Sequence, residues 1–135
     1  MENNEIFNYD PRLENVRRYV DEHLADPLPL GRVAKVAGLE RKYFSSFFHQ
    51  QVGMCFRDWL AAKRIDRAVQ MIRSANYTIT HVALSAGFSS LRAFERAFKK
   101  TMGMSPRAFK KQVRPRPVTS DVRPFQPAAE RQAGS

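Results

Sequence analysis

The feature that most constrains this sequence is an internal repeat. The sequence VAKVAGL at residues 33–39 recurs as VALSAGF at residues 82–88, and the two glycines, Gly38 and Gly87, are 49 residues apart. Beyond the glycines the offset becomes 50 residues, with further matches of Phe44 to Phe94, Phe48 to Phe98, and Gly53-Met54 to Gly103-Met104. We interpret the extra residue as an insertion in the second turn, where insertions are tolerated. A repeat of this period predicts two copies of one supersecondary unit.

Each copy has the residues that a helix-turn-helix requires. Two helices that cross closely, at roughly 90–120°, are joined by a turn of about three or four residues that often contains glycine. Ala34 and Ala83 are small enough for the crossing, and Gly38 and Gly87 accept positive φ in the turn without steric cost. Apolar residues around each turn predict a shared core of Val33, Ala37, Leu39, Phe44 and Phe48 in one copy, and Val82, Ala86, Phe88, Phe94 and Phe98 in the other. Two ordinary helical hairpins would have the same core, so the repeat alone leaves that alternative open.

The remaining pattern predicts an all-α, homeodomain-like fold of seven helices. Asp10 with Pro11, Thr78, Ser89 or Ser90, and Ser105 with Pro106 are expected helix starts. A long helix over residues 56–73 is predicted to bridge the two units, with Trp59 on its apolar face. The expected organisation is a flexible N-terminus at 1–9, a first helix-turn-helix subdomain at 10–54, a linker helix at 55–75, a second subdomain at 76–113 and a disordered tail containing proline and arginine at 114–135.

Charge and cysteine content limit the partners. The formal net charge is +10, from 23 Lys and Arg against 13 Asp and Glu, which favours a polyanion such as nucleic acid or an anionic membrane surface. Cys55 is the single cysteine, so an internal disulfide is excluded, and the three histidines lack neighbours at metal-ligand spacing. No apolar run approaches the roughly 20 residues that span a bilayer. We therefore predict a cytoplasmic protein with no membrane partner, metal or cofactor.

An enzyme is not expected, and an interaction module is the main alternative. The sequence offers no nucleophile with a partner base and no glycine-rich phosphate loop. A degenerate helix-turn-helix pair could instead modulate another regulator or RNA polymerase without specific DNA binding. The basic residues that remain after each turn argue for DNA. RNA is disfavoured because the major groove of an A-form duplex is too narrow for a helix.

The second copy resembles the DNA-binding domain of the AraC/XylS family of bacterial transcription regulators. The likeness rests on ITHVALSAGFSS at residues 79–90, FERAFKK at 94–100 and GMSPRAF at 103–109, while KRIDRA at 63–68 resembles the family's linker helix. It covers roughly residues 12–112. The resemblance implies two helix-turn-helix units bridged by a long helix, each with a recognition helix in the major groove. Because only about ten residues precede the first predicted helix, the chain resembles family members that lack a sensor domain, and a fragment of a longer protein is the alternative.

The first copy departs from this pattern at two positions. Glu40 stands where the family usually has a capping serine, and glutamate is a poorer cap although its charge suits a helix N-terminus. Cys55 stands where the second copy has Ser105. We interpret the cysteine as a small neutral replacement and not as a redox switch, because no neighbouring cation is evident to lower its pKa.

The candidate DNA contacts are the outward residues of the two recognition helices. In the first helix these are Arg41, Lys42, Ser45, Ser46 and His49, with Phe44, Phe47 and Phe48 pointing inward. In the second they are Ser90, Arg92, Glu95, Arg96, Lys99 and Lys100. Arg41 or Lys42 could read guanine, and the resemblance favours Arg92 and Arg96 as major-groove contacts. Glu95 could accept from a cytosine amine or orient Arg96, while Lys99, Lys100, Lys110 and Lys111 are expected on phosphates. A solvated arginine, or an ion pair between Arg96 and the linker helix, is the alternative.

The predicted linker helix suggests how one chain meets DNA. About 18 residues at 1.5 Å per residue give roughly 27 Å, enough to hold two recognition helices near one DNA turn, about 34 Å, apart. We therefore expect a monomer on an asymmetric site in double-stranded DNA. The resemblance favours an activator that contacts RNA polymerase, in a bacterial, nucleoid-associated setting.

Overall fold

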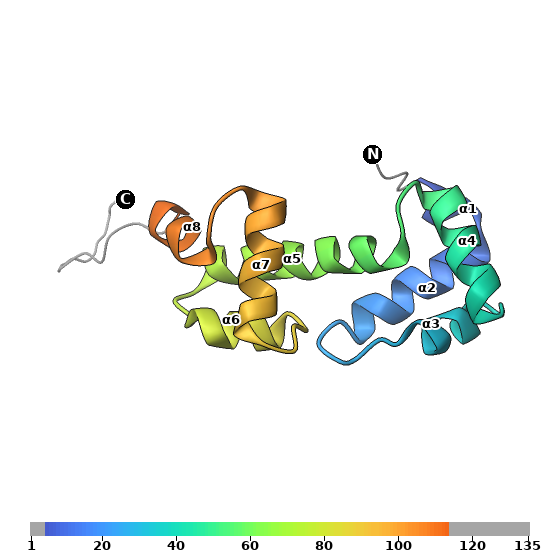
Figure 1. The fold of residues 1–135 in the computed structure, drawn as a ribbon, viewed down its shortest axis with the longest axis horizontal. Helices are drawn as coiled ribbons and strands as arrows, with labels where there is room; N and C mark the ends of the chain where they lie inside the picture. Colours follow the sequence, from blue (N-terminus) through green and yellow to red (C-terminus); the bar gives the residue numbers. More distant parts are fainter. Residues whose placement is uncertain (1–4, 114–135) are drawn as a thin grey trace.

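The computed structural model describes residues 5–113, and in this part of the chain every regular element is a helix (Figure 1). The predicted tail at residues 114–135 lies outside the described residues. In chain order the helices are α1 (Ile6–Tyr9), α2 (Pro11–Glu22), α3 (Leu30–Val36), α4 (Arg41–Val52), α5 (Phe56–Ser74), α6 (Ile79–Ser85), α7 (Leu91–Met102) and α8 (Pro106–Val113). Within residues 5–113, none of these helices combines the length and the apolar character needed to cross a membrane.

Two separate hydrophobic cores share α5. The first core lies among α1, α2, α3, α4 and the first half of α5, which contributes Phe56, Trp59 and Leu60. The second lies among α6, α7, α8 and the second half of α5, which contributes Ile65, Ala68 and Ile72. Trp59 is 2% exposed, as the apolar face of the predicted linker requires. The all-α arrangement of two helix-turn-helix units on one long helix is confirmed.

Local side-chain caps explain why four of the described helices begin where the sequence predicts. The Asp10 carboxylate accepts from the Arg12 backbone N–H at 2.9 Å, and Pro11 follows at the first helical position. Thr78 accepts from the His81 N–H at 3.0 Å. Ser90 and Ser105 cap α7 and α8 in the same way, each accepting at 3.1 Å from the backbone N–H three residues later. Each bond satisfies one of the donors that a helix N-terminus leaves without an intrahelical partner.

The described part of the chain has one helix more than the seven predicted, because a short turn precedes α2. Residues 1–9 were expected to be flexible, yet residues 6–9 form α1. Phe7 is 1% exposed, and its ring stacks on Trp59 with 5.3 Å between centroids and lies 6.2 Å from Phe48. Burial of one aromatic ring in a core shared with α5 is the physical reason why so short a segment is held.

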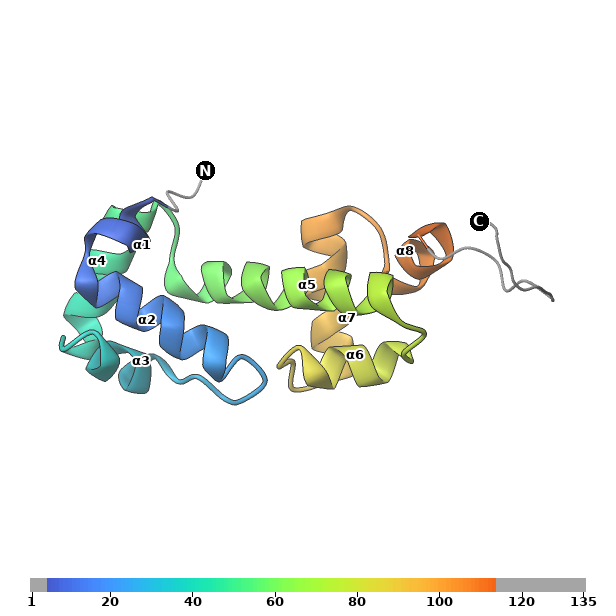
Figure 2. The same cartoon turned by 180° about the vertical axis from the view of Figure 1, so that it is seen from behind.

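The helices that follow the two turns point the same way. In Figures 1 and 2, α4 lies beyond the start of α5 and α7 lies across its second half, and both run in the same sense. α5 has 19 residues, which corresponds to about 28 Å at 1.5 Å per residue. The helices that follow the two turns, α4 and α7, are therefore held apart in the two halves of the molecule, with α5 joining them.

Candidate nucleic-acid interface

The same backbone turn positions α4 and α7. In the first unit the Leu39 N–H donates to the Ala34 carbonyl at 3.0 Å, and the Gly38 N–H donates to the Lys35 carbonyl at 2.9 Å. The corresponding bonds in the second unit run from Phe88 to Ala83 at 3.0 Å and from Gly87 to Leu84 at 3.1 Å. Both turns are thus Schellman motifs with a left-handed glycine, at φ +74° for Gly38 and +103° for Gly87. The repeat in sequence is therefore a repeat in backbone hydrogen bonding.

The predicted contact residues of α7 and its cap are all exposed. The buried side of the helix carries Phe94 and Phe98, each 0% exposed. The exposed set comprises Ser90, Arg92, Glu95, Arg96, Lys99 and Lys100. Within residues 5–113, no ion pair engages Arg96, so the expected alternative of pairing with the linker helix is not realised there. Since no ion pair in this part of the chain engages Arg92 either, both guanidinium groups of α7 are available to an external acceptor.

α4 presents a less basic surface of the same kind. Phe44, Phe47 and Phe48 are buried, as predicted. The residues predicted to face outward are exposed: Arg41, Lys42, Ser45, Ser46 and His49. Tyr43 is also exposed, and its ring stacks on Phe47 at 6.2 Å between centroids. Tyr43 is not among the contacts predicted from the sequence.

α4 and α5 lack the side-chain caps that the matching helices α7 and α8 have. No side-chain hydrogen bond from Glu40 caps α4, and none from Cys55 caps α5. At the matching helix starts, Ser90 and Ser105 do bond to the backbone. The two departures noted in the sequence therefore correspond to two missing hydrogen bonds.

One of the lysines expected on phosphates has an internal acceptor. The Lys110 ammonium donates to the Tyr77 carbonyl at 2.6 Å, which ties α8 to the segment before α6. Lys111 is exposed. The structure thus gives Lys110 a structural contact that sequence position did not reveal, because its acceptor is a backbone oxygen 33 residues away.

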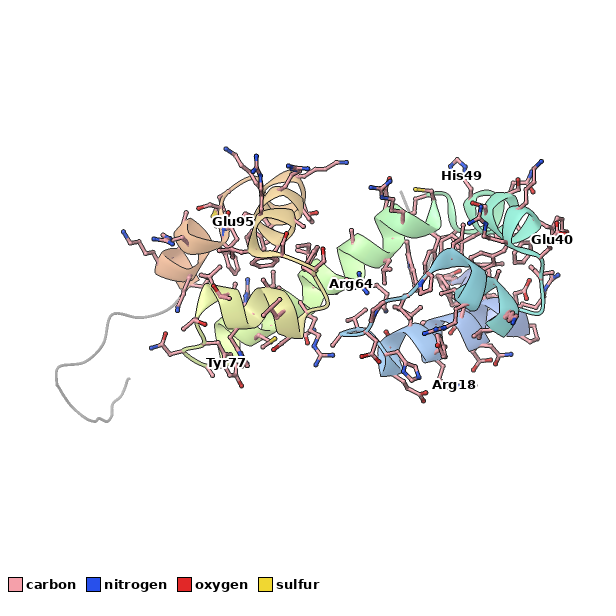
Figure 3. The ribbon with its side chains drawn as sticks, turned by 60° about the horizontal axis from the view of Figure 1, so that its bottom comes forward. Arg18, Glu40, His49, Arg64, Tyr77 and Glu95 are labelled. Carbon is pink, nitrogen blue, oxygen red and sulfur yellow. The ribbon has the colours of Figure 1, made fainter. Side chains whose placement is uncertain are left out.

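The exposed residues of both recognition helices lie along one edge of the molecule. Figure 3 shows His49 of α4 and Glu95 of α7 on that edge, whereas Arg18 and Tyr77 lie on the opposite edge. Among residues 5–113, no group of three or more His, Cys, Asp or Glu side chains could hold a metal ion. The arrangement offers two helices, one in each half of the molecule, with positive and hydrogen-bonding side chains, a geometry suited to reading a grooved polyanion.

Known proteins are similar to this chain in both sequence and fold. The helix-turn-helix domain family matches residues 33–112. The chain is 30% identical over 105 residues to the regulatory protein PocR of Salmonella typhimurium, a match that covers 78% of this chain and 35% of PocR. The chain therefore spans about a third of the length of PocR.

Solved structures of transcription regulators have a similar fold. The DNA-binding domain of the global transcriptional factor AdpA, solved in complex with a target DNA, superimposes with a TM-score of 0.71 at 28% identity, over 76% of this chain and 92% of that one. An AraC-type transcriptional regulator from Chromobacterium violaceum shares the fold, with a TM-score of 0.71 at 23% identity, over 78% of this chain and 94% of that one. The family match covers most of the described residues, including both helix-turn-helix units and the long helix between them. The chain therefore belongs to the AraC/XylS family of helix-turn-helix transcription regulators.

Proposed function

We propose that this protein is a sequence-specific regulator of transcription that binds double-stranded DNA as a monomer. Its two units, residues 10–54 and 76–113, insert α4 and α7 into two successive segments of the major groove. The observation that carries the proposal is the placement of two exposed basic helices along one edge, in the same sense, on a helix of about 28 Å.

Base recognition is assigned to the side chains that project from this edge. Arg92 and Arg96 are one helical turn apart on α7, and a guanidinium can donate two bonds to the O6 and N7 atoms of guanine. Glu95 accepts from a cytosine amine or orients Arg96. On α4, Arg41 or Lys42 reads guanine, and Ser45, Ser46 and His49 make the shorter-range contacts.

Phosphate contacts supply the remaining affinity. Lys99 and Lys100 lie in the last turn of α7 and are exposed. Their ammonium groups, together with the α7 N-terminus capped by Ser90, meet the DNA backbone on either side of the groove. Because such contacts release counterions, binding weakens as salt rises.

A monomer on an asymmetric site follows from the parallel arrangement of the units. In a two-fold dimer, the recognition helices are related by rotation and read a palindrome. Here α4 and α7 run in the same sense and carry different side chains. Each chain therefore reads two unlike half-sites in tandem, about one DNA turn apart.

The proposed setting is the bacterial cytoplasm, at the nucleoid. The regulatory effect we favour is activation through contact with RNA polymerase. PocR is named a regulatory protein and AdpA a global transcriptional factor, and both carry a matching domain.

The proposal is tested by selecting sites from a randomised duplex pool and measuring the mass of the complex on the selected duplex. We expect an asymmetric site of about two helical turns, occupied by one chain. A palindromic site occupied by two chains would overturn the monomer mechanism. Failure to enrich any site would favour the alternative of a module that modulates another regulator or RNA polymerase.

A further inference from the structure

Arg64 lies on α5 between the two hydrophobic cores and binds a connection in the first unit (Figure 3). Its side chain is partly buried. Its Nε donates to the Leu24 carbonyl at 3.2 Å, and its Nη2 donates to the Asp26 carbonyl at 2.8 Å. Both acceptors belong to the connection between α2 and α3. One guanidinium therefore clamps this connection to the middle of α5.

The turn of the second unit closes on the same clamp. A Cβ atom built on Gly87 would lie 2.2 Å from the Leu24 carbonyl oxygen and 2.6 Å from Arg64 Nε. These separations are far below van der Waals contact, so only glycine allows the turn between α6 and α7 to approach so closely. Gly38 occupies the equivalent position in the first unit, yet a Cβ there would meet nothing within 4 Å. The two glycines share a backbone conformation, but only Gly87 has a neighbour from the other unit.

The chemistry of the clamp suits a fixed joint. Burial lowers the pKa of the Arg64 guanidinium, but arginine stays protonated in proteins, so the group donates as a cation. Bonds from a charged donor are shorter and stronger than neutral ones, and the rigid fork of a guanidinium reaches two acceptors in a defined geometry. Lysine offers a single flexible point charge and cannot reproduce this fork.

Within residues 5–113, no helix of the first unit packs extensively against a helix of the second, and both units pack on α5. The two cores meet α5 on either side of it, the first through Leu60 and the second through Ile65. The Lys63–Asp21 ion pair, at 2.9 Å, fastens α5 to α2 of the first unit only. Arg64 and Gly87 instead bring α5, the first unit and the second unit together at one point.

We propose that Arg64, the carbonyls of Leu24 and Asp26, and Gly87 form a lock that sets the spacing and rotation of the two recognition helices. Arg64 is a positioning residue, because it acts on DNA recognition through α4 and α7. On the function proposed above, on which this consequence rests, the lock makes the protein selective for the number of base pairs between the two half-sites. The geometry of the protein itself can be tested without DNA.

The DNA-free test measures the distance between spin labels on Lys35→Cys in α3 and Thr80→Cys in α6, in a Cys55→Ser background, by pulsed dipolar spectroscopy. We expect one narrow distance distribution for the otherwise native protein. Arg64→Met removes both donors, and Gly87→Ala adds the clashing Cβ, so both should broaden or shift the distribution. Gly38→Ala imposes similar backbone strain without the clash and should leave it unchanged. Native distributions for both Arg64→Met and Gly87→Ala would overturn the lock, because α5 alone would then fix the geometry.

The DNA test compares the site selected by the native chain with the same site carrying one extra base pair between its halves. One added pair rotates the second half-site by about 34°. We expect the native chain to lose at least about tenfold in affinity and Arg64→Met to lose less than about threefold, with circular dichroism confirming that both are folded. Equal losses in the two proteins would contradict the role of Arg64 in spacing. Failure of the native chain to select any site would refute the proposed function, whereas the label distances would still decide whether the lock exists.

Discussion

Phe48 and Phe98 occupy the same position in the two repeats, and we predict that replacing Phe48 by leucine destabilises the protein more. Both side chains are 0% exposed, so the change in apolar burial is similar at the two positions. Within residues 5–113, their aromatic surroundings differ. Phe48 lies against four rings, with centroid distances of 6.2 Å to Phe7, 5.7 Å to Phe44, 5.4 Å to Phe56 and 5.3 Å to Trp59. Phe98 lies against two rings, Phe94 and Phe109, each at 5.5 Å.

The expected difference follows from the two additional ring pairs. An aromatic pair contributes about 0.5–1.5 kcal/mol beyond the area it buries, and leucine keeps the apolar contact while losing the ring. Two additional pairs therefore give a difference of about 1–3 kcal/mol, toward the lower end because the Phe7 pair is the most widely spaced. The free energy of unfolding should fall by this much more for Phe48→Leu than for Phe98→Leu.

Urea denaturation measures the difference directly. Trp59 is the single tryptophan and lies in the first core, so its fluorescence reports unfolding of that unit, while circular dichroism reports all helices. Equal slopes against urea in the two variants would permit direct comparison of the midpoints. A loss of stability in Phe98→Leu equal to or greater than that in Phe48→Leu would show that the additional ring pairs do not stabilise the first core.

Three further predictions concern the ends of helices. Phe7→Ala should lower the free energy of unfolding by about 3 kcal/mol, as for other large buried side chains. The control Tyr9→Ala, at a residue 77% exposed, should change it by less than about 0.5 kcal/mol, and similar effects of the two variants would mean that Phe7 does not hold α1. Cys55→Ser should raise thermal stability by about 0.5–1 kcal/mol by adding the cap that Ser105 makes on α8, and an unchanged melting temperature would contradict this. The hydrogen bond from Arg12 holds the pKa of Asp10 below its ordinary 3.8, so the stability that the Asp10 carboxylate contributes is present above pH 3.8 and is lost as the pH falls through the lower folded pKa. Asp10→Asn should therefore reduce the fall of the melting temperature in acid, and an unchanged fall would exclude Asp10 as its source.

Local signals account for the part of the fold that could be predicted. A capping side chain bonds to a backbone N–H only two or three residues away. The helix starts at Asp10, Thr78 and Ser90 could therefore be predicted from the local sequence alone. The repeat likewise predicted both turns, because the Schellman bonds span only a few residues. The exposure of the candidate contact residues followed from helical periodicity alone.

Long-range contacts account for what could not be predicted. α1 is too short to show a period, and the burial of Phe7 depends on Trp59, which is distant in sequence. Gly38 and Gly87 have equivalent sequence contexts, yet only the second meets a carbonyl of the other unit. Arg64 was placed on the linker helix by its sequence, but its acceptors lie 38 and 40 residues earlier. Periodicity also does not say which base an exposed arginine reads.

The central claim, that α7 reads bases through Arg92 and Arg96, is tested most directly by measuring affinity for the selected duplex and for single-base variants of it. Arg18→Ala is the matched control, because it removes the same charge from an exposed residue on the opposite edge. We predict that Arg92→Ala and Arg96→Ala each cost about 1–3 kcal/mol on the selected site and relax preference at one base pair, while Arg18→Ala leaves both unchanged. If all three variants weaken binding equally, with unchanged base preference and a strong dependence on salt, the charge acts only on phosphates and the claim is wrong.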